Sequence, residues 1–351
     1  MDEGDLFPSF DVDIEGMIEL LKEKNYEKVL LQVPEGLKRG ALSLAEHIER
    51  ETRARVFVDA EISYGACDHA GTRARLLGIE AVLHLGHAEI PSMSSECSVP
   101  VHFFPTFMKI EMGPILRGLE EVLERSKDKR FGIATTVQHV GAMEILKDEL
   151  KKRGRMGVVG GPGSREDLPG QVLGCSFHSP RSVSQEVDSY IYLGTGNFHP
   201  VGMVNAVKKP VWGIDPMTGA VTGYGEKDLE DFLRKRWAAI SKAREWIEKE
   251  GRIGIVLGTK PGQKREALAG DILNTCLSKG CRTSMLVLDH VDPMKLRSLG
   301  VDVAVITACP RIAYDDISRY ISENVVVVTY QEALIALGVE EWENYTFDEK
   351  W

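Results

Sequence analysis

The sequence lacks the features that mark a nucleic-acid binder, a membrane protein or a disulfide-rich secreted protein. Lys and Arg number 43 against 53 Asp and Glu, a net charge of −10, which argues against a non-specific nucleic-acid or anionic-membrane surface. The longest apolar runs, such as the one around Val325 to Val328, fall far short of the roughly 20 residues that span a bilayer. Six cysteines in 351 residues are too few for a disulfide framework, so they are thiols, metal ligands or core residues.

The ends and the overall composition indicate an ordinary globular protein. Met1 to Asp5 are acidic and lead into no apolar stretch, so we expect neither a signal nor a transit peptide, and a cytoplasmic location. The hydrophobic fraction of 43% and the charged fraction of 27% are those of a soluble globular chain. A chain of 351 residues exceeds the length at which a single core keeps growing, so we expect two or three compact domains.

Short β-branched runs alternate with helical patterns, which is typical of βαβ units around parallel sheets. The pattern runs three times and predicts three tandem α/β domains, 1–108, 109–213 and 214–351, arranged about a pseudo-threefold axis. We expect strands at 29–33, 55–59, 81–85, 101–104, 132–136, 156–160, 189–193, 209–213, 253–257, 282–288, 301–307 and 325–329, and helices at 38–50, with Leu42, Ala45 and Ile48 on one face, 141–152, 228–249 and 264–278.

Cysteines recur at matching places in these repeats. The segment Val82–His87 matches Tyr190–Thr195, and a proline follows each one. Cys67 and Cys175 each stand 18 residues before the leucine of the Leu-Gly pair in the matching segment. In the third repeat Cys309 follows the corresponding strand directly, a placement that supports the pattern without being equivalent to it.

The loops beyond the carboxyl ends of parallel strands are where such sheets bind ligands, so one loop cysteine from each repeat can meet its counterparts. Three thiolates are what a four-iron four-sulfur cluster needs if one iron is to stay open for a substrate. Cys67, Cys175 and Cys309 are all flanked by small or turn-forming residues, whereas a cysteine buried as a small hydrophobe is the common alternative. We interpret the other three as structural or incidental: Cys97, Cys276 and Cys281.

Several stretches together resemble the archaeal diphthamide synthase family, the 2-(3-amino-3-carboxypropyl)histidine synthases. They are Gln32–Leu37, Ala60–Cys67 with the fairly specific Tyr-Gly-Ala-Cys-Asp, the Gly-Cys pair at Cys175, and the context of Cys309. The resemblance covers nearly the whole chain. It implies a homodimer of three-domain subunits, each holding one 4Fe–4S cluster through Cys67, Cys175 and Cys309. The C-x3-C-x2-C motif of the usual radical enzymes is absent from this chain.

The resemblance also implies the reaction. One electron from the reduced cluster enters the sulfonium of S-adenosylmethionine bound at the open iron, and the bond from sulfur to Cγ breaks. Methylthioadenosine leaves, and the 3-amino-3-carboxypropyl group joins C2 of one histidine imidazole in translation elongation factor 2. This is the first step of diphthamide biosynthesis. The implied partners are the elongation factor and an electron donor that the sequence does not identify; we expect no membrane and no direct nucleic-acid contact.

Polar residues at the end of the first strand of each repeat are candidates to bind S-adenosylmethionine, although each could equally be a cap or turn residue. They are Gln32, Glu35, Thr136, Gln138, His139, Thr259, Lys260 and Gln263. His69, beside Cys67, is a candidate hydrogen-bond donor to the cluster.

Other motifs are weaker. The pairs Cys67/His69 and His84/His87 lack the spacing that marks a zinc site. Gly258–Lys264 is one residue short of a phosphate loop, and Gly157–Gly163 lacks the dinucleotide-binding spacing. The acidic, aromatic segment 341–345 could be a dimer contact, a partner contact or a helix cap.

Two alternatives remain. One is a quinolinate synthase-like iron–sulfur enzyme, which would share three pseudo-symmetric units with one cysteine each but act on small acids. The other is a non-catalytic partner subunit of a diphthamide synthase complex. Such a subunit could dispense with the cysteines, and all three are present here.

Overall fold

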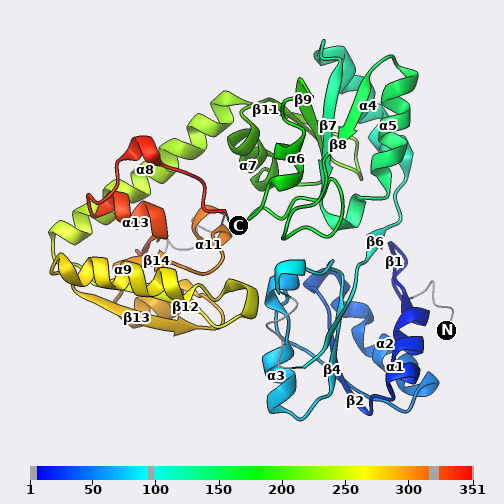
Figure 1. Ribbon diagram of the computed structural model, residues 1–351, viewed down its shortest axis with the longest axis horizontal. Coiled ribbons are helices and arrows are strands. Elements are labelled where there is room, and N and C mark those ends of the chain that lie inside the picture. Colours follow the sequence, from blue (N-terminus) through cyan, green and yellow to red (C-terminus); the bar gives the residue numbers. More distant parts are fainter. Residues whose placement is uncertain (1–5, 94–98, 316–323, 350–351) are drawn as a thin grey trace. The chain divides into compact units, whose positions relative to one another are not determined.

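The chain is described by a computed structural model for residues 6–93, 99–315 and 324–349 (Figure 1). It folds into two compact units. The first unit comprises 1–173, 178–196 and 209–223, and the second comprises 174–177, 197–208 and 224–351. Among the described residues, none of the helices has the length and apolar character needed to cross a membrane.

Three parallel sheets form the framework, and all three have the same strand order. Numbered within each sheet along the chain, the strands lie in the order second, first, third, fourth. Every neighbouring pair among these strands is parallel. The first sheet contains β2 (Lys28–Gln32), β3 (Arg55–Val58), β4 (Ala81–Leu85) and β5 (Val101–Phe104); the second β7 (Arg130–Thr135), β8 (Met156–Val159), β9 (Ser189–Leu193), β10 (Val211–Ile214) and the added β11 (Val221–Tyr224); the third β12 (Ile253–Gly258), β13 (Thr283–Leu288), β14 (Val303–Ile306) and β15 (Val326–Thr329).

The predicted class, α/β with parallel sheets, is therefore confirmed. The domain boundaries at 108/109 and 213/214 and the pseudo-threefold axis stay predictions. A separate antiparallel pair joins β1 (Phe10–Asp11) to β6 (Phe107–Met108).

Helices and short 3-10 turns connect the strands. The α-helices are α1 (Ile14–Lys24), α2 (Lys38–Glu51), α3 (Gly71–Leu76), α4 (Met112–Arg125), α5 (Ala142–Lys152), α6 (His178–Ser182), α7 (Phe198–Val207), α8 (Glu226–Glu248), α9 (Glu266–Ser278), α10 (Pro293–Ser298), α11 (Arg311–Tyr314) and α13 (Tyr330–Ala336). The 3-10 turns are η2 (Glu35–Leu37), η3 (Ala66–Asp68), η4 (Pro91–Met93), η5 (Val137–His139), η6 (Pro261–Gln263) and η7 (Trp342–Asn344).

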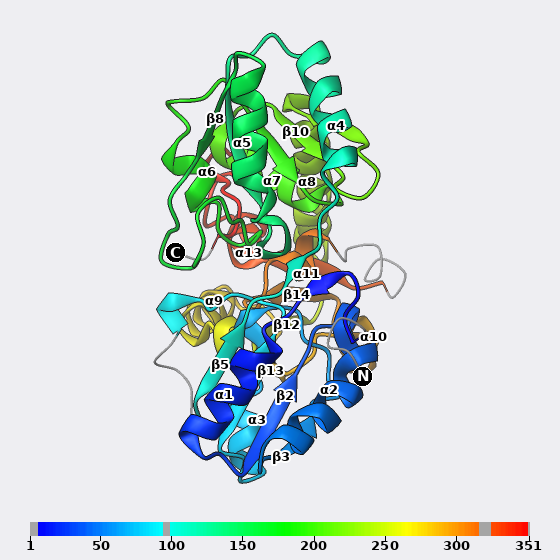
Figure 2. The same cartoon turned by 90° about the vertical axis from the view of Figure 1, so that its right-hand side faces the viewer.

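Helix α2 (Figure 2) lies within one residue of its predicted range, and of the predicted face Ala45 and Ile48 are buried whereas Leu42 is not. Its buried positions include Ala41, Leu44, Ala45 and Ile48, the i, i+3, i+4, i+7 spacing of a helix face. The expectation for Leu42 was wrong, because that side chain is 66% exposed. Ala41 already occupies the inward position, and the next residue points about 100° away around the helix axis.

Each sheet has its own apolar core, and its third strand is the most deeply buried. All residues of β4, β9 and β14 are buried. Strands covered on both faces expose their polar groups mainly at their ends, so the carboxyl ends become the places where side chains can do chemistry.

The segment 341–345 packs on its own unit. The Tyr345 hydroxyl donates to Glu332 Oε1 at 3.2 Å, and the Trp342 ring lies 5.0 Å from that of Trp237 in α8. These contacts hold the segment on its own unit, and its role as a dimer contact, a partner contact or a helix cap stays a prediction.

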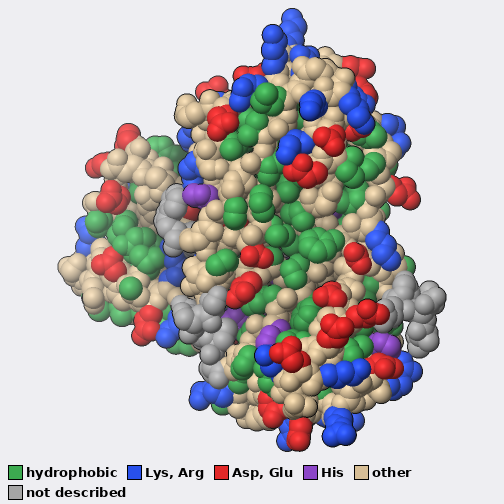
Figure 3. All heavy atoms as spheres, turned by 45° about the vertical axis from the view of Figure 1, so that its right-hand side comes forward, with side chains coloured by type: hydrophobic (Ala, Val, Ile, Leu, Met, Phe, Trp, Pro, Cys, Tyr) green, Lys and Arg blue, Asp and Glu red, His purple; other side chains and the backbone are tan. Residues whose placement is uncertain are grey.

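The described surface carries mixed charge. On the face shown in Figure 3, acidic and basic side chains are interspersed rather than gathered by sign. This agrees with the net charge of −10, which is modest for a chain of this size.

Candidate functional site

In each of the three sheets, a buried polar side chain forms a hydrogen bond between the first and third strands at their carboxyl ends. In the first sheet Gln32 of β2 is the register partner of His84 of β4, and the two side chains are hydrogen-bonded at 2.8 Å. In the second, Thr135 Oγ1 donates to the Leu193 carbonyl at 2.7 Å. In the third, Thr307 Oγ1 donates to the Val256 carbonyl at 2.8 Å. Strand order reverses at this point, which is where doubly wound sheets bind ligands.

Gln32 also anchors the loop that carries Cys67. Its Nε2 donates to the Asp68 carbonyl at 2.8 Å, and its Oε1 accepts from the Ala70 amide at 2.9 Å. The Tyr64 amide donates to Asp68 Oδ2 at 3.3 Å and closes the turn around the cysteine. A residue predicted to bind the cofactor therefore has its amide engaged in holding the cysteine loop on the sheet.

Cys67 itself is half-buried and packs against an apolar cluster. The buried members are Ala66, Ile90 and Met93, and Leu173 from the second repeat joins them. The thiol is therefore held in a rigid setting of small and apolar neighbours.

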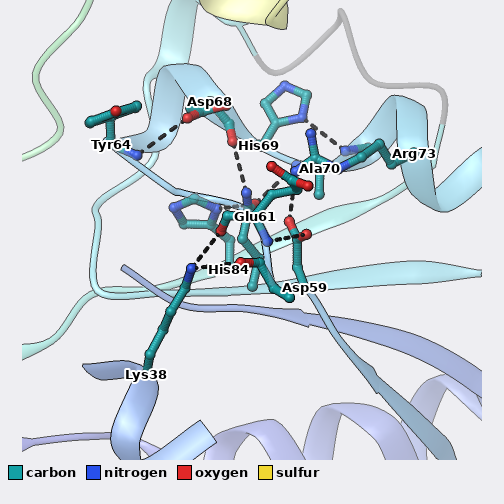
Figure 4. A network of polar contacts seen from close by, with 12 residues as sticks. Lys38, Asp59, Glu61, Tyr64, Asp68, His69, Ala70, Arg73 and His84 are labelled. Carbon is teal, nitrogen blue, oxygen red and sulfur yellow. Dashed lines mark hydrogen bonds and ion pairs between the residues drawn. The ribbon is translucent and has the colours of Figure 1, made fainter. Parts of the chain in front are cut away.

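The outer side of the same loop is pinned by charged residues, which Figure 4 shows around it. Lys38 Nζ donates to the carbonyls of Ala60 and Glu61, both at 2.9 Å. Arg73 forms a 2.6 Å ion pair with Asp59. The predicted cofactor residue Glu35 lies on this outer side, where it pairs with Lys38 at 2.5 Å.

His84 and His87 continue the chain of hydrogen bonds from Gln32. The partners Asp68 and Ala70 fix the orientation of the Gln32 amide, so Oε1 faces His84 and accepts from its Nδ1–H. His84 Nε2 then accepts from His87 Nδ1 at 3.0 Å, which leaves the lone pair of His87 on Nε2. Burial lowers the pKa of His84 well below its usual value and that of His87 to about 4, so both rings are neutral near pH 7.

His69 lies two residues after Cys67 and is also neutral near pH 7. Burial lowers its pKa, and its Nδ1 accepts from the Gly71 amide at 3.4 Å. The ring proton is therefore on Nε2, the form that can donate a hydrogen bond, as the prediction for this residue requires.

The candidates of the second repeat follow β7. Gln138 Nε2 donates to the Gly86 carbonyl, at the end of β4, at 3.2 Å. His139 is half-buried, its Nδ1 has no hydrogen-bond partner in the part of the chain that the structure describes, and burial lowers its pKa. Thr136 is the half-buried residue that precedes η5. Gln138 thus links the carboxyl edges of the first two sheets.

The candidates of the third repeat differ in exposure. Thr259 Oγ1 donates to Asp289 Oδ1 at 3.0 Å in an exposed position, whereas Lys260 and Gln263 are buried around η6. These buried side chains follow β12 directly, at the carboxyl edge of the third sheet.

The segments of Cys175 and Cys309 meet at the start of α7, within the second unit. Gly174 has a φ of +71°, and a Cβ there would lie 2.4 Å from Phe198 Cε1 and 3.3 Å from His199 Nε2. The guanidinium of Arg311, two residues after Cys309, lies 5.1 Å over the same Phe198 ring. Both the backbone conformation and the close packing therefore require glycine immediately before Cys175.

The Cys175 segment is held from its other side by residues far along the chain. The Phe177 amide donates to Glu349 Oε2 at 3.3 Å, and the Phe177 ring packs edge-on against Phe347 at 6.0 Å. Cys175 and Cys309 are both half-buried.

The remaining cysteines have other surroundings. Cys276 is a core residue of α9, and burial raises its pKa to about 11. Cys281 packs half-buried against the same core. Cys97 lies outside the described residues. Within 6–93, 99–315 and 324–349, no three His, Cys, Asp or Glu side chains are grouped to hold a single metal ion; a cluster differs, because its cysteines bind separate iron atoms.

Comparison with known proteins identifies the family. The model of the family described as "Putative diphthamide synthesis protein" matches residues 33–346. The chain belongs to this family. A 2-(3-amino-3-carboxypropyl)histidine synthase of Pyrococcus horikoshii is 35% identical over 94% of this chain and 90% of its own length, and one of Methanocaldococcus jannaschii is 28% identical over 97% and 93%. The crystal structure of Dph2 from Pyrococcus horikoshii with a 4Fe-4S cluster has a TM-score of 0.83 at 33% identity, covering 97% of this chain and 94% of that one.

The resemblance of the sequence to the diphthamide synthase family is thus confirmed. Some residues of the candidate site were not indicated by the sequence. The support role of Gln32 and the corner of Phe198, His199 and Arg311 are tertiary contacts between segments with no local motif. The one usable signal was Gly174, since a glycine directly before a loop cysteine often marks a constrained backbone.

Proposed function

We propose that this chain catalyses the first step of diphthamide biosynthesis. It transfers the 3-amino-3-carboxypropyl group of S-adenosylmethionine to a histidine of a protein substrate, translation elongation factor 2. The observation that carries the proposal is the 35% identity, over nine-tenths of both chains, to a protein named for this reaction product. The family match over 33–346 and the shared fold support it.

The proposed cofactor is one 4Fe–4S cluster held by Cys67, Cys175 and Cys309. The donor set fits, because three half-buried thiols leave one iron for substrate. The Dph2 structure with such a cluster supports the assignment. When bound, the cluster supplies the electron that breaks the sulfur–Cγ bond of S-adenosylmethionine.

The residues of this chain hold the cysteine loops in place and orient S-adenosylmethionine. Gln32 fixes the Cys67 loop and Gly174 allows the backbone that presents Cys175, and we propose that His69 donates a hydrogen bond from its Nε2–H to the cluster. We propose that the polar side chains after the first strands line the site for S-adenosylmethionine: Thr136, Gln138, His139, Thr259, Lys260 and Gln263. Gln32 and Glu35 act beside them as supports of the loop.

The proposed setting is a cytoplasmic homodimer that takes its electron from a separate donor. A dimer of the isolated chain in analytical ultracentrifugation would agree with this, and a monomer that is fully active would contradict it.

The test uses the anaerobically purified protein, a chemical reductant, S-adenosylmethionine labelled in its aminocarboxypropyl carbons, and elongation factor 2. We expect label on one histidine of the factor and release of methylthioadenosine. Cys67→Ala should remove both the brown colour and the labelling, whereas Cys281→Ala, at a half-buried cysteine outside the proposed set, should keep both.

A colourless wild-type protein with full activity would contradict the cluster. Product formation from small acids, without labelled protein, would favour the quinolinate synthase-like alternative, and activity only after adding a second subunit would favour the partner-subunit alternative.

A further inference from the structure

A buried arginine lies in the connection that leads to Cys175. Arg165 is 8% exposed, and its Nε and Nη2 are buried without a hydrogen-bond partner among the residues that the structure describes. A guanidinium stays protonated in proteins, and a buried charge is costly unless an anion offsets it. Nε and Nη2 form one edge of the guanidinium, the edge that binds both oxygens of a carboxylate at once.

The neighbouring carboxylate does not provide that anion. Glu166 is buried, its Oε2 accepts from the Gly163 amide at 3.0 Å, and its Oε1 has no hydrogen-bond partner among the described residues, so the carboxylate does not pair with Arg165. The loop is tightly packed, since a Cβ at Gly163 would lie 2.7 Å from Glu166 Oε2. No carboxylate of the described residues forms an ion pair with Arg165.

The loop of Arg165 is held by backbone hydrogen bonds at the carboxyl end of β7, in the second sheet. The Gly170 amide donates to the Gly160 carbonyl at 2.9 Å, and the amides of Thr135 and Val172 bind the same stretch to the end of β7 at 2.9 and 2.8 Å. On the other side, the Ser92 amide donates to the Ser164 carbonyl at 3.1 Å.

That second contact joins the loop to the neighbourhood of Cys67. Ser92 belongs to η4, whose Met93 packs in the apolar cluster against Cys67. Leu173, from the same connection as Arg165, packs in this cluster too. The loop that carries Arg165 therefore lies beside the Cys67 loop within the first unit.

We propose that Arg165 binds the α-carboxylate of S-adenosylmethionine through Nε and Nη2. This rests on the proposed function, and it makes Arg165 a positioning residue. Holding the amino-acid end of the sulfonium limits how its three carbon substituents can turn, which favours cleavage on the Cγ side. Methylthioadenosine has no carboxylate, so the product loses this contact as soon as the bond has broken.

The test measures equilibrium binding of S-adenosylmethionine and of methylthioadenosine by calorimetry. The protein is the oxidised, cluster-loaded enzyme without reductant, so no turnover occurs. We expect Arg165→Met to weaken S-adenosylmethionine binding by about 10- to 100-fold and to leave methylthioadenosine binding unchanged. Arg165→Lys, which keeps the charge but not the two-pronged edge, should lie between wild type and Arg165→Met.

The matched control is Arg75→Met, which removes one exposed positive charge from the same unit and should change neither affinity. Equal binding of S-adenosylmethionine by wild type and both Arg165 variants would overturn the role of Arg165 and leave the proposed function intact. A parallel loss of methylthioadenosine binding would overturn it as well, because the contact would then not be specific to the carboxylate. A cluster-loaded wild type that binds no S-adenosylmethionine would overturn both proposals.

Discussion

Two buried arginines, one in each unit, differ in the partners of their guanidinium groups. Arg236 is 1% exposed, and its Nε and Nη2 bind the two oxygens of Glu332 at 2.7 and 2.5 Å. Its remaining donors reach the carbonyls of Ala313 at 2.7 Å and Val327 at 3.1 Å. Arg165 is almost as buried, yet the same two nitrogens have no hydrogen-bond partner within 6–93, 99–315 and 324–349.

The difference teaches how to tell a structural charge from a binding charge. Arg236 joins α8, α11, β15 and α13, and although burial alone would lower its pKa, the Glu332 carboxylate outweighs this and raises it. Its partner is part of the chain. The loop of Arg165 is held in place by backbone contacts, and no described residue pairs with the Nε and Nη2 edge of its guanidinium.

The largest effect is expected at the paired arginine. Arg236→Met should lower the free energy of unfolding by about 3–5 kcal/mol, because it leaves the Glu332 carboxylate buried and unpaired. Urea denaturation of the cluster-free protein measures this. Arg234→Met, on the exposed side of the same helix, is the control and should change stability by less than about 0.5 kcal/mol. If the two substitutions lowered the free energy of unfolding equally, the buried Arg236–Glu332 pair would not be a special source of stability.

A somewhat smaller loss of stability is expected on substitution of Gln32, which holds the Cys67 loop, whereas Arg236 joins elements of a core. Gln32→Leu leaves the Asp68 carbonyl and the Ala70 amide without their buried partner, a loss of about 2–3 kcal/mol. Hydrogen exchange of the Ala70 amide should accelerate, while that of the amides in β12 should not change. Unaltered exchange at Ala70 would show that Gln32 does not hold the Cys67 loop.

His87 should make stability depend on pH. Its folded pKa is about 4 against about 6.5 in the unfolded chain, so the unfolded state binds more protons between these values. Stability is therefore complete above pH 6.5 and falls as the pH drops toward 4, by on the order of 2–3 kcal/mol. His87→Asn should flatten this part of the pH profile of unfolding, whereas His178→Asn, at an exposed site, should leave it steep. A profile that is equally steep in both variants would contradict the assignment.

The smallest change, and the one opposite in sign to Arg236→Met, is expected for the stability of Arg165→Met. Without ligand the variant should be as stable as wild type or more so, because an apolar side chain replaces a buried charge that no described residue pairs with. Added S-adenosylmethionine should raise the melting temperature of wild type more than that of the variant. A marked loss of stability without ligand would mean that Arg165 is a structural charge like Arg236.

The strands were predictable because parallel strands are buried on both faces and appear as short apolar runs. Expected strands at 81–85 and 189–193 coincide with β4 and β9. Helix α2 was predictable in its ends and in the inward positions of Ala45 and Ile48, but not at its start, where Ala41 and not Leu42 faces the core. The cysteine spacing came from the repeat itself, which the common strand order supports.

The site could be predicted only in its residue types. Gln32 and Arg165 both stand in polar loops of the sequence, and nothing local distinguishes the one whose partners lie in the chain from the one without partners. Burial and pairing of loop side chains depend on segments that are distant in sequence. The contact from Ser92 to Ser164 is one such case.

The clamp on the Cys175 segment sets an order of events during synthesis. Glu349 follows Phe177 by 172 residues, so the ribosome makes the second half of the protein before this segment can acquire its hydrogen bond and its Phe347 neighbour. Cys175 thus leaves the exit tunnel long before its surroundings exist. Iron and sulfide should therefore be loaded after translation of this region, not while the chain is emerging.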